Sequence, residues 1–276
     1  MKHKCVIFLT ACVNPGGMAN TLHTDCRQRM EEYKKALCFY LQKTKLPIVF
    51  CENTLCDMSG EFSSYIASGR LEYLTFDGNH YDKRRGKGVG EIEILEYAFL
   101  HSKLLQDGTH VIKITGRLKV LNIRMLIAVR KMFGDNCIQL RINKDGTFVH
   151  SQIFIAPVLF LKKYFIPLKE YVDDRDYIYF EHMLGKAVKE QNEYDLFPLF
   201  DIPLIRGISG TNTQAYQSNL SVYERLQCVR WVLADNLYFN KKYALKKRPF
   251  VNQFLVKIYW TIIIFCVLVC QLIIRK

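Results

Sequence analysis

The sequence lacks the cysteine and histidine spacings that mark common metal and redox sites. Its ten cysteines include no Cys-x-x-Cys pair, and many lie inside apolar runs, where a thiol behaves as a small hydrophobic group. Its seven histidines form neither a His-x-x-x-His nor a His-Glu-x-x-His pattern, so we name no metal ligand. These absences exclude a structural zinc site and a disulfide scaffold. The free thiols are typical of a reducing cytoplasm.

An internal repeat, a low-complexity linker and an export signal are also missing. At the start of the chain two lysines precede only the short apolar run 5–9, and a Pro-Gly turn at 14–17 follows. This pattern predicts a strand and a loop rather than a signal peptide. With 276 residues, half of them hydrophobic, the chain is long enough for one sizeable folded domain.

Acidic residues are absent from the C-terminal part of this basic chain. The sequence carries 39 Lys and Arg against 26 Asp and Glu, a formal net charge of +13. Residues 241–276 hold eight of these cations and no acid, which leaves +5 for residues 1–240. Because the excess charge is not interleaved with aromatic residues around one loop, we predict no nucleic-acid partner. A non-catalytic protein that binds polyanions or nucleotides at a membrane remains an alternative.

The C-terminal apolar run predicts a membrane anchor. Residues 258–274 contain no charge, and as a helix they would extend about 26 Å, just under the roughly 30 Å hydrocarbon core of a bilayer. Basic residues and the aromatic pair Tyr259 and Trp260 lie at its start, as at a membrane interface. We predict a basic juxtamembrane segment over 238–257 and a membrane-inserted helix over 258–274. A buried core helix and an interfacial hairpin are the alternatives.

Predicted strands and helices alternate along the first half of the chain. Short apolar runs predict strands, and apolar residues at helical spacing predict helices between them. Alternation with short connections favours an α/β fold, in which helices cover a mostly parallel sheet. Ligands of such folds bind beyond the carboxyl ends of the strands. The expected strands are 5–13, 47–51, 71–76 and 110–115, and the expected helices are 27–44 and 91–106.

The second half of the chain predicts a small antiparallel addition to that sheet. Three short strands are expected, and a turn at 143–146 joins the first two as in a hairpin. A helix over 177–190 and a helical region over 214–237 follow. The three short strands are 138–141, 147–150 and 153–155.

A basic, glycine-rich segment follows the strand at 71–76. It places four cations within five residues, just before a predicted helix start. Glycines let a backbone approach a ligand closely, and a helix start presents unpaired amides, so Lys87, Gly88 and Gly90 are expected to bind a phosphate or diphosphate. The spacing matches neither a Walker loop nor a dinucleotide fingerprint. A solvated, mobile loop is the alternative.

A second basic segment ends the strand at 110–115. Because side chains alternate along a strand, Lys113, Thr115 and Arg117 are expected on one face of the sheet. Two cations on a sheet face need an anionic partner, and a ligand phosphate would supply one. The alternative partners are acids of the preceding helix, namely Glu91, Glu93 and Glu96.

These motifs together resemble a family of bacterial sugar transferases. The combination is Lys-Gly-x-Gly-Glu at 87–91, Lys-Ile-Thr-Gly-Arg at 113–117, an apolar strand pair near Gln152 and Gly-Ile-Ser-Gly-Thr at 207–211. It is similar to the glycosyltransferase-like proteins of capsule and lipopolysaccharide loci, nucleotide-sugar transferases of the GT-A type with a short C-terminal membrane segment. The resemblance covers roughly residues 4–225. No Asp-x-Asp metal motif ends a strand in the first half, so a divalent metal, Mg or Mn, is left open.

The resemblance implies a fold and an activity. Residues 1–237 would form a GT-A-like catalytic domain, anchored to the cytoplasmic face of the bacterial inner membrane by its tail. The enzyme would transfer a sugar from a nucleotide-sugar donor to a lipid-linked saccharide acceptor in surface polysaccharide synthesis. A membrane-associated phosphotransferase is a rival class, although neither a nucleophile nor paired metal carboxylates are evident.

The resemblance also implies roles for individual residues. Lys87, Lys113 and Arg117 would stabilise the leaving diphosphate as cations. Glu181 would be the base that accepts the proton of the acceptor hydroxyl, unless it pairs with Lys186 or is solvated. The remaining candidates are Asp77 for the donor ribose or sugar, Arg206, Ser209 and Thr211 for a closing loop, Arg27 and Arg29 for phosphate, Glu52 and Asn53 for the nucleobase, and Asp173, Asp174 and Asp176 as other bases.

Overall fold

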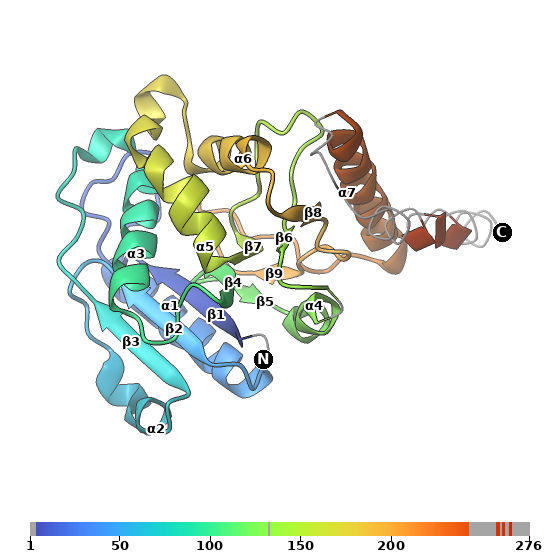
Figure 1. Cartoon of the computed structure of the whole chain (residues 1–276). Coiled ribbons are helices and arrows are strands. Elements are labelled where there is room, and N and C mark those ends of the chain that lie inside the picture. Colours follow the sequence, from blue (N-terminus) through green and yellow to red (C-terminus); the bar gives the residue numbers. More distant parts are fainter. Residues whose placement is uncertain (1–3, 132, 243–257, 260, 263–264, 267–276) are drawn as a thin grey trace.

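A mixed seven-stranded sheet forms the centre of the protein (Figure 1). The computed structural model describes residues 4–131, 133–242, 258–259, 261–262 and 265–266. Strand order is β3-β2-β1-β4-β7-β6-β8; β7 runs antiparallel to both of its neighbours, and the other pairings are parallel. The strands are β1 (Lys4–Ala11), β2 (Ile48–Glu52), β3 (Leu71–Thr75), β4 (Thr109–Thr115), β6 (Cys137–Gln139), β7 (Ile153–Pro157) and β8 (Asp195–Phe197).

Helices α1, α2 and α4 cover one face of this sheet. Helix α1 begins after Asp25, whose side chain accepts a hydrogen bond from the Gln28 amide at 3.0 Å and so caps the helix. Apolar residues recur at helical spacing, and Tyr33, Leu37 and Tyr40 are buried against β1 and β2. The helical elements on this side are α1 (Cys26–Lys43), the 3₁₀ turn Ser59–Phe62, α2 (Ser63–Ala67) and α4 (Ile123–Arg130).

The opposite face is covered by α3, α5 and α6. Leu95 and Phe99 of α3 pack on the sheet, where the Phe99 ring lies 6.1 Å from that of Phe8. At the start of α6, Phe180 meets Phe165 edge to face at 4.7 Å. The helical elements here are the 3₁₀ turn Lys83–Arg85, α3 (Lys87–His101), α5 (Val158–Phe160), the π turn Leu161–Phe165, the 3₁₀ turns Ile166–Tyr171 and Asp174–Asp176, and α6 (Phe180–Glu190).

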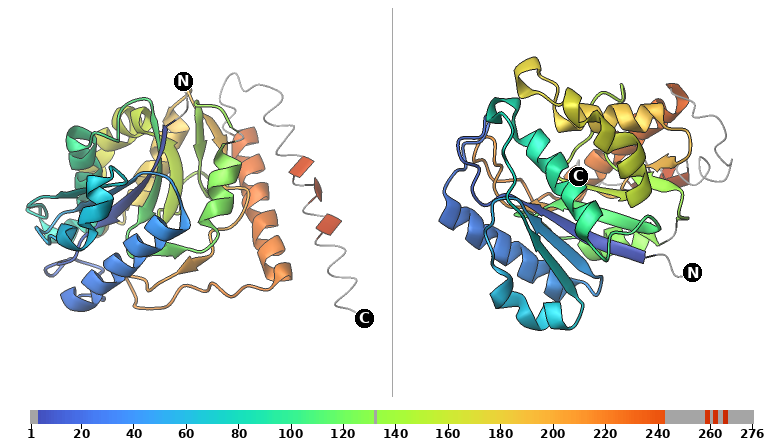
Figure 2. Two further views of the ribbon diagram at one scale, coloured as in Figure 1. Left: turned by 90° about the horizontal axis from the view of Figure 1, so that it is seen from below. Right: turned by 60° about the vertical axis from the view of Figure 1, so that its left-hand side comes forward.

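The far edge of the sheet carries a third, smaller core. Helix α7 (Val222–Lys242) lies at the end of the molecule remote from α2 and β3 (Figures 1 and 2). It packs Val229 and Leu233 against Phe197 and Phe200, next to β8. A separate two-stranded sheet pairs β5 (Lys119–Val120) with β9 (Ile205–Arg206) and so ties the end of β4 to the segment before α7.

The observed fold confirms the predicted class and corrects its second half. A mostly parallel sheet covered by helices is present, and the predicted strands of the first half are in place. The predicted antiparallel addition is wrong as an appendage, because β7 lies inside the main sheet between β4 and β6. The expected strand at 147–150 is reduced to a single bridge between Ile142 and Val149. Helix α3 begins at Lys87, earlier than the expected Glu91.

Most of the predicted C-terminal anchor lies outside the described residues. Within the part of the chain that the structure describes, no helix is both long and apolar enough to cross a bilayer. Residues 243–257 and most of 258–274 fall outside that part, so the predicted juxtamembrane segment and inserted helix stay predictions. The described Tyr259 donates a hydrogen bond from its hydroxyl to the Phe200 carbonyl at 2.6 Å, which places it against the third core.

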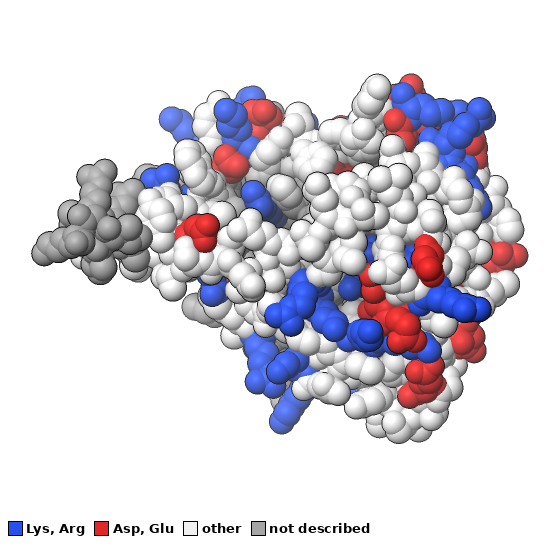
Figure 3. All heavy atoms as spheres, turned by 180° about the vertical axis from the view of Figure 1, so that it is seen from behind, with Lys and Arg blue, Asp and Glu red and all other residues white. Residues whose placement is uncertain are grey.

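Charged side chains form several separate groups on the molecular surface. In Figure 3 red acids lie beside blue cations at the top and on the right, whereas a group of cations at the lower left has no acid next to it. Elsewhere on the surface, ion pairs include Lys162 with Asp107 at 2.7 Å and Lys169 with Glu96 at 2.6 Å.

Candidate functional site

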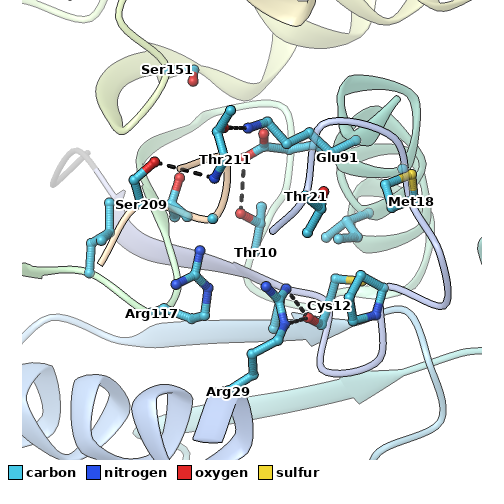
Figure 4. Close-up of a pocket in the computed structure, with 18 of the residues that line it drawn as sticks. Thr10, Cys12, Met18, Thr21, Arg29, Glu91, Arg117, Ser151, Ser209 and Thr211 are labelled. Atoms are coloured by element: carbon cyan, nitrogen blue, oxygen red, sulfur yellow. Dashed lines mark hydrogen bonds between the residues drawn. The ribbon is translucent and has the colours of Figure 1, made fainter. Parts of the chain in front are cut away.

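A cavity of about 260 Å³ lies at the carboxyl ends of β1, β2 and β4 (Figure 4). We call it the strand-end cavity. It occupies the edge of the sheet where a parallel α/β fold binds ligands, and its walls come from segments far apart in the sequence. The lining side chains considered below are Thr10, Cys12, Arg29, Tyr33, Asn53, Asn79, Lys87, Glu91, Thr115, Arg117, Ser151, Glu181, Ser209 and Thr211.

Arg29 of α1 places a buried cation in the cavity wall. The residue is only 5% exposed, and its guanidinium donates to the carbonyls of Cys12, Val13 and His23 at 2.9–3.1 Å. Its hydrogen-bond partners in the described chain are carbonyls and the Tyr33 hydroxyl, not carboxylates. A buried cation that lacks a counter-charge favours an anionic ligand nearby.

Arg117 brings a second buried guanidinium to the same cavity (Figure 4). Its Nη1 donates to Glu32 at 3.1 Å and to the Ile208 carbonyl at 3.0 Å, while its Nε is buried without a hydrogen-bond partner. Burial acts to lower the pKa of Arg117, but the ion pair with Glu32 outweighs it and the pKa is raised. Arg117 therefore stays charged, and its Nε has no hydrogen-bond partner in the described part of the chain.

Neutral groups accompany these two cations. Burial raises the pKa of the Cys12 thiol and of the Tyr33 phenol, so both are uncharged at neutral pH. Neither group therefore offsets the positive charge of the guanidinium groups. This side of the cavity has the electrostatic character of a phosphate site.

The loop 207–216 lies over the strand-end cavity as a strap. The Gly210 carbonyl accepts from the amides of Leu22 and His23 at 3.0 and 3.3 Å, which joins the strap to the loop after β1. Lys87, in the first turn of α3, donates to the Thr211 hydroxyl. Figure 4 shows Ser209 and Thr211 on the strap, with the Thr211 amide bonded to the Ser209 hydroxyl at 3.3 Å. Three distant segments therefore close one wall.

Two carboxylates line the cavity in different environments. Glu91 of α3 accepts from Thr10 Oγ1 at 3.2 Å and is ion-paired with Lys113. Glu181, in the first turn of α6, accepts a hydrogen bond from Ser151 Oγ at 2.6 Å. Lys186, the cation considered as its alternative partner, pairs with Glu190 instead. Glu91 is thus ion-paired with a lysine, whereas the contact that the described chain gives the Glu181 carboxylate is a serine hydroxyl.

Asn53, directly after β2, presents an unused acceptor to the cavity. The residue is 1% exposed, and its amide nitrogen donates to Asn79 Oδ1 at 2.9 Å, while its Oδ1 is buried without a partner. The neighbouring Glu52 is fully occupied, because it accepts from the amides of Val13, Thr54 and Cys56 at 2.8–3.0 Å. Of the two residues considered for a nucleobase, Asn53 lines the cavity and Glu52 fastens the loops behind it.

The residues of this site do not fit the divalent metal that the sequence left open. In the described ranges no group of three or more His, Cys, Asp and Glu side chains is arranged to hold a metal ion. Of the two cavity carboxylates, Glu91 is bonded to a lysine and Glu181 to a serine hydroxyl. The buried cations Arg29 and Arg117 line the same cavity, and we derive no step through Mg or Mn.

The structure brings most of the predicted site residues together. Among the candidate site residues named in advance, nine line the strand-end cavity: Arg29, Asn53, Lys87, Gly90, Thr115, Arg117, Glu181, Ser209 and Thr211. Gly88 lies behind the wall, where a Cβ would come within about 3.0–3.2 Å of Val172 and Phe180. Asp77 is exposed and pairs with His80, and Arg206 is exposed on β9; neither lines the cavity.

Two expectations about the basic segments are wrong. Lys113 and Arg117 do not share a face, because β4 ends at Thr115 and the chain turns there, with the Gly116 amide donating to the Thr10 carbonyl at 2.9 Å. Lys113 is 0% exposed and pairs with Glu91 under α3, whereas Arg117 pairs with Glu32 of α1 on the other side. The glycine-rich segment is not a mobile loop: Gly88 and Gly90 are buried in the first turn of α3.

Several cavity residues carry no sequence signal of their own. Tyr33 lies in a helix and Asn79 in a loop, where both residue types are common, and Ser151 precedes a short strand. Arg29 was considered only as a charge at a helix start, where solvation is the usual outcome. Its burial depends on the path of the loop after β1, which no local pattern specifies.

No protein-family model and no curated protein matches the chain, whereas solved structures do. It is similar to S. aureus TarS 1–349 in complex with UDP at 13% identity and TM-score 0.35, over 84% of this chain and 65% of that one, just under two thirds of its length. A Leptospira borgpetersenii cytidylyltransferase matches at 12% identity and TM-score 0.40, over 90% and 99%. Core-mannan synthase A from Aspergillus fumigatus, in an Mn/GDP form, matches at 9% and 0.38, over 69% and 72%. At such scores the similarity assigns no function.

Proposed function

We propose that the chain is a glycosyltransferase that moves a sugar from a nucleotide-sugar donor to an acceptor hydroxyl. One observation carries this proposal: buried guanidinium groups line the cavity at the strand ends together with Glu181, a carboxylate that has no ion pair in the described part of the chain. Arg29 and Arg117 suit the diphosphate of the donor, and Glu181 suits the proton of the acceptor. A nucleotide-binding protein without catalytic activity would have no use for the second feature.

The cations would act on the leaving group. When the bond between the anomeric carbon and the diphosphate oxygen breaks, its electron pair passes to that oxygen, and negative charge develops there. The guanidinium of Arg117 would stabilise this charge, together with the ammonium of Lys87, because both side chains line the cavity. Because both groups are held in place by other contacts, they need little reorganisation during the reaction.

Glu181 would act on the nucleophile. The acceptor oxygen forms the new bond to the anomeric carbon, and its proton passes to the free oxygen of the Glu181 carboxylate. Ser151 Oγ, 2.6 Å from Glu181 Oε1, occupies one carboxylate oxygen and so orients the other. Glu91 is less suited to this role, because its carboxylate already contacts Lys113 and Thr10 Oγ1 within the protein.

The test is donor turnover by Arg117→Gln. A panel of nucleotide sugars is incubated with the protein, and released nucleoside diphosphate is measured with and without acceptors. We expect Arg117→Gln to lower turnover of the best donor by about 100- to 1000-fold, because a preorganised charge contact is lost. Arg124→Gln is the control, since Arg124 is an exposed cation outside the cavity. Thermal unfolding verifies that both variants fold, and unchanged turnover in a folded Arg117→Gln protein contradicts the proposal.

We further propose that the acceptor is a lipid-linked saccharide used in bacterial surface polysaccharide synthesis, at the cytoplasmic face of the inner membrane. The support is the uncharged run 258–274 with its basic flank. Removing residues 250–276 is expected to move the protein from the membrane to the soluble fraction while donor hydrolysis persists. High salt alone should release little of the full-length chain, because an inserted helix does not depend on charge. Sedimentation of the shortened chain with membranes would contradict this assignment.

A further inference from the structure

Another cavity continues along the same edge of the sheet. It has a volume of about 280 Å³, and we call it the edge cavity. Its walls include Arg141, just beyond the carboxyl end of β6, and Leu199, just beyond that of β8. Both strands point the same way as β4, because two antiparallel pairings separate β6 from β4 and β8 is parallel to β6. The two cavities thus open on one side of the sheet.

The two cavities share a wall next to the proposed base. Gln152 and Tyr216 line both of them. Ser151, the neighbour of Gln152 in the chain, bonds to Glu181 in the strand-end cavity, while His150 on its other side lines the edge cavity. A molecule bound in the edge cavity would therefore contact His150 and Gln152, the two chain neighbours of the serine that is bonded to Glu181.

The walls of the edge cavity are mainly aliphatic. Ile153, Leu199 and Ile202 are buried, and Ile205 and Leu220 are half-buried beside them. Such walls favour an apolar group, because burial removes its surface from water at roughly 25 cal/mol per Å². Sugar hydroxyls alone would leave these contacts unused.

One cation stands at the rim of this apolar space. Arg141 is exposed, and the described chain gives its guanidinium no ion pair, although it acts electrostatically on Asp235 of α7. His150 is the other titratable group in the wall, and burial together with Arg141 lowers its pKa to about 4. At neutral pH the cavity consequently presents apolar walls and a single positive charge.

We propose that the edge cavity is the acceptor subsite, and that it takes an acceptor in which a saccharide is joined through an anionic group to an apolar moiety. The apolar part would contact Leu199 and Leu220, the anion would bind Arg141, and the saccharide would extend past Gln152 toward Glu181. This inference rests on the proposed function, which supplies the donor and the base. A cavity of about 280 Å³ holds only the first part of a long apolar chain, and the rest would leave by the rim.

Binding of hexyl phosphate tests the chemistry of this subsite without any turnover. Titration followed by NMR should show saturable binding to the full-length protein, while inorganic phosphate and hexanol at equal concentration bind far more weakly. Arg141→Gln should weaken hexyl phosphate binding about tenfold, as expected for the loss of one charged contact. Leu220→Trp, which fills part of the cavity, should weaken it as well. Lys163→Gln, an exposed cation that lines neither cavity, is the matched control.

The same variants separate this inference from the proposed function. Arg117→Gln should abolish donor turnover yet leave hexyl phosphate binding intact, because Arg117 does not line the edge cavity. With an alkyl-phosphate-linked saccharide as acceptor, Arg141→Gln should raise the acceptor KM and leave hydrolysis of the donor by water unchanged. Absent hexyl phosphate binding, or binding equally sensitive to Arg117→Gln and Lys163→Gln, overturns the subsite. If the wild-type protein hydrolyses none of the nucleotide sugars, the proposed function is overturned instead.

Discussion

The two cavities on the strand ends differ in how they hold their charge. In the strand-end cavity Arg29 and Arg117 are buried and fixed by several hydrogen bonds, whereas Arg141 at the edge cavity is exposed and unpaired. A fixed, desolvated cation suits a transition state whose charge develops at one position, and an exposed cation suits a group that only needs to be attracted and retained. If both proposals hold, the strand-end cavity would carry out the reaction and the edge cavity would bind the acceptor.

The strongest test of this comparison is Glu181→Gln, because Glu181 lines the strand-end cavity and accepts a hydrogen bond from Ser151, the neighbour in the chain of Gln152, which lines both cavities. The amide preserves size and the hydrogen bond from Ser151, but it cannot accept the acceptor proton. Transfer should fall by about 100- to 10,000-fold, while binding of nucleoside diphosphate and of hexyl phosphate persists. Sugar transfer and both affinities are measured on the same protein.

A matched control for this change lies on the same helix. Glu190→Gln alters an exposed acid of α6 that pairs with Lys186, and it should leave transfer near the wild-type rate. Near-normal transfer by Glu181→Gln would move the base elsewhere, to one of Asp173, Asp174 and Asp176 or to no protein group. All three acids belong to the turn before α6, and none of them lines the strand-end cavity.

Lys113→Met tests how a buried lysine behind the strand-end cavity stabilises its walls. Lys113 is buried and contacts Glu91 and the Ser151 carbonyl, the latter at 2.9 Å, so it braces the segments that carry both cavity carboxylates. Its removal takes the cationic partner from Glu91 and leaves only the hydrogen bond from Thr10, and we expect a loss of about 3 kcal/mol in the free energy of unfolding. Chemical denaturation measures this loss. The double variant Lys113→Met with Glu91→Gln should recover part of it, and no recovery would show that packing, not charge, is at issue.

His150 gives the smallest expected effect and belongs to the edge cavity. Its pKa is lowered from 6.5 to about 4 by burial and by Arg141, so the folded chain binds this proton less readily than the unfolded chain. Stability should therefore fall as the pH is lowered from about 6.5 to about 4, and stay flat with respect to this group below that range. Thermal unfolding between pH 7 and pH 5, compared with His150→Gln, measures the contribution. An equal slope in both proteins would rule it out.

The first half of the fold was predictable because its signals are local. The strand at 48–52 and helix α1 follow from apolar runs and from the Asp25 cap, and the polar residues after the strands fall at one edge as a parallel sheet requires. Lys87 and Arg117 were found from such local signals, whereas Glu181 was assigned from the family resemblance. Their meeting in one cavity follows from the topology once the sheet is parallel.

The remainder depended on contacts that sequence spacing does not encode. The position of β7 inside the sheet is a long-range pairing, and nothing in residues 153–157 distinguishes an interior strand from an added one. Lys113 and Arg117 point in opposite directions because the chain turns directly after β4 ends at Thr115. The prediction applied the alternation of side chains along a strand to Arg117, which lies beyond that end. Arg141 carried no signal, because its importance comes from aliphatic neighbours about sixty residues later in the chain.

The interior position of β7 has a consequence for how this protein folds during its synthesis on the ribosome. The chain emerges with β1 to β4 first, and these four strands can already pair. One edge of β4 then stays bare until residues 153–157 arrive, although β6 has been synthesised in between. A premature β6–β4 pairing would occupy the place of β7. Until β7 has been synthesised, one edge of β4 is therefore exposed and can pair with a wrong strand, and correct folding requires that β6 does not pair with it first.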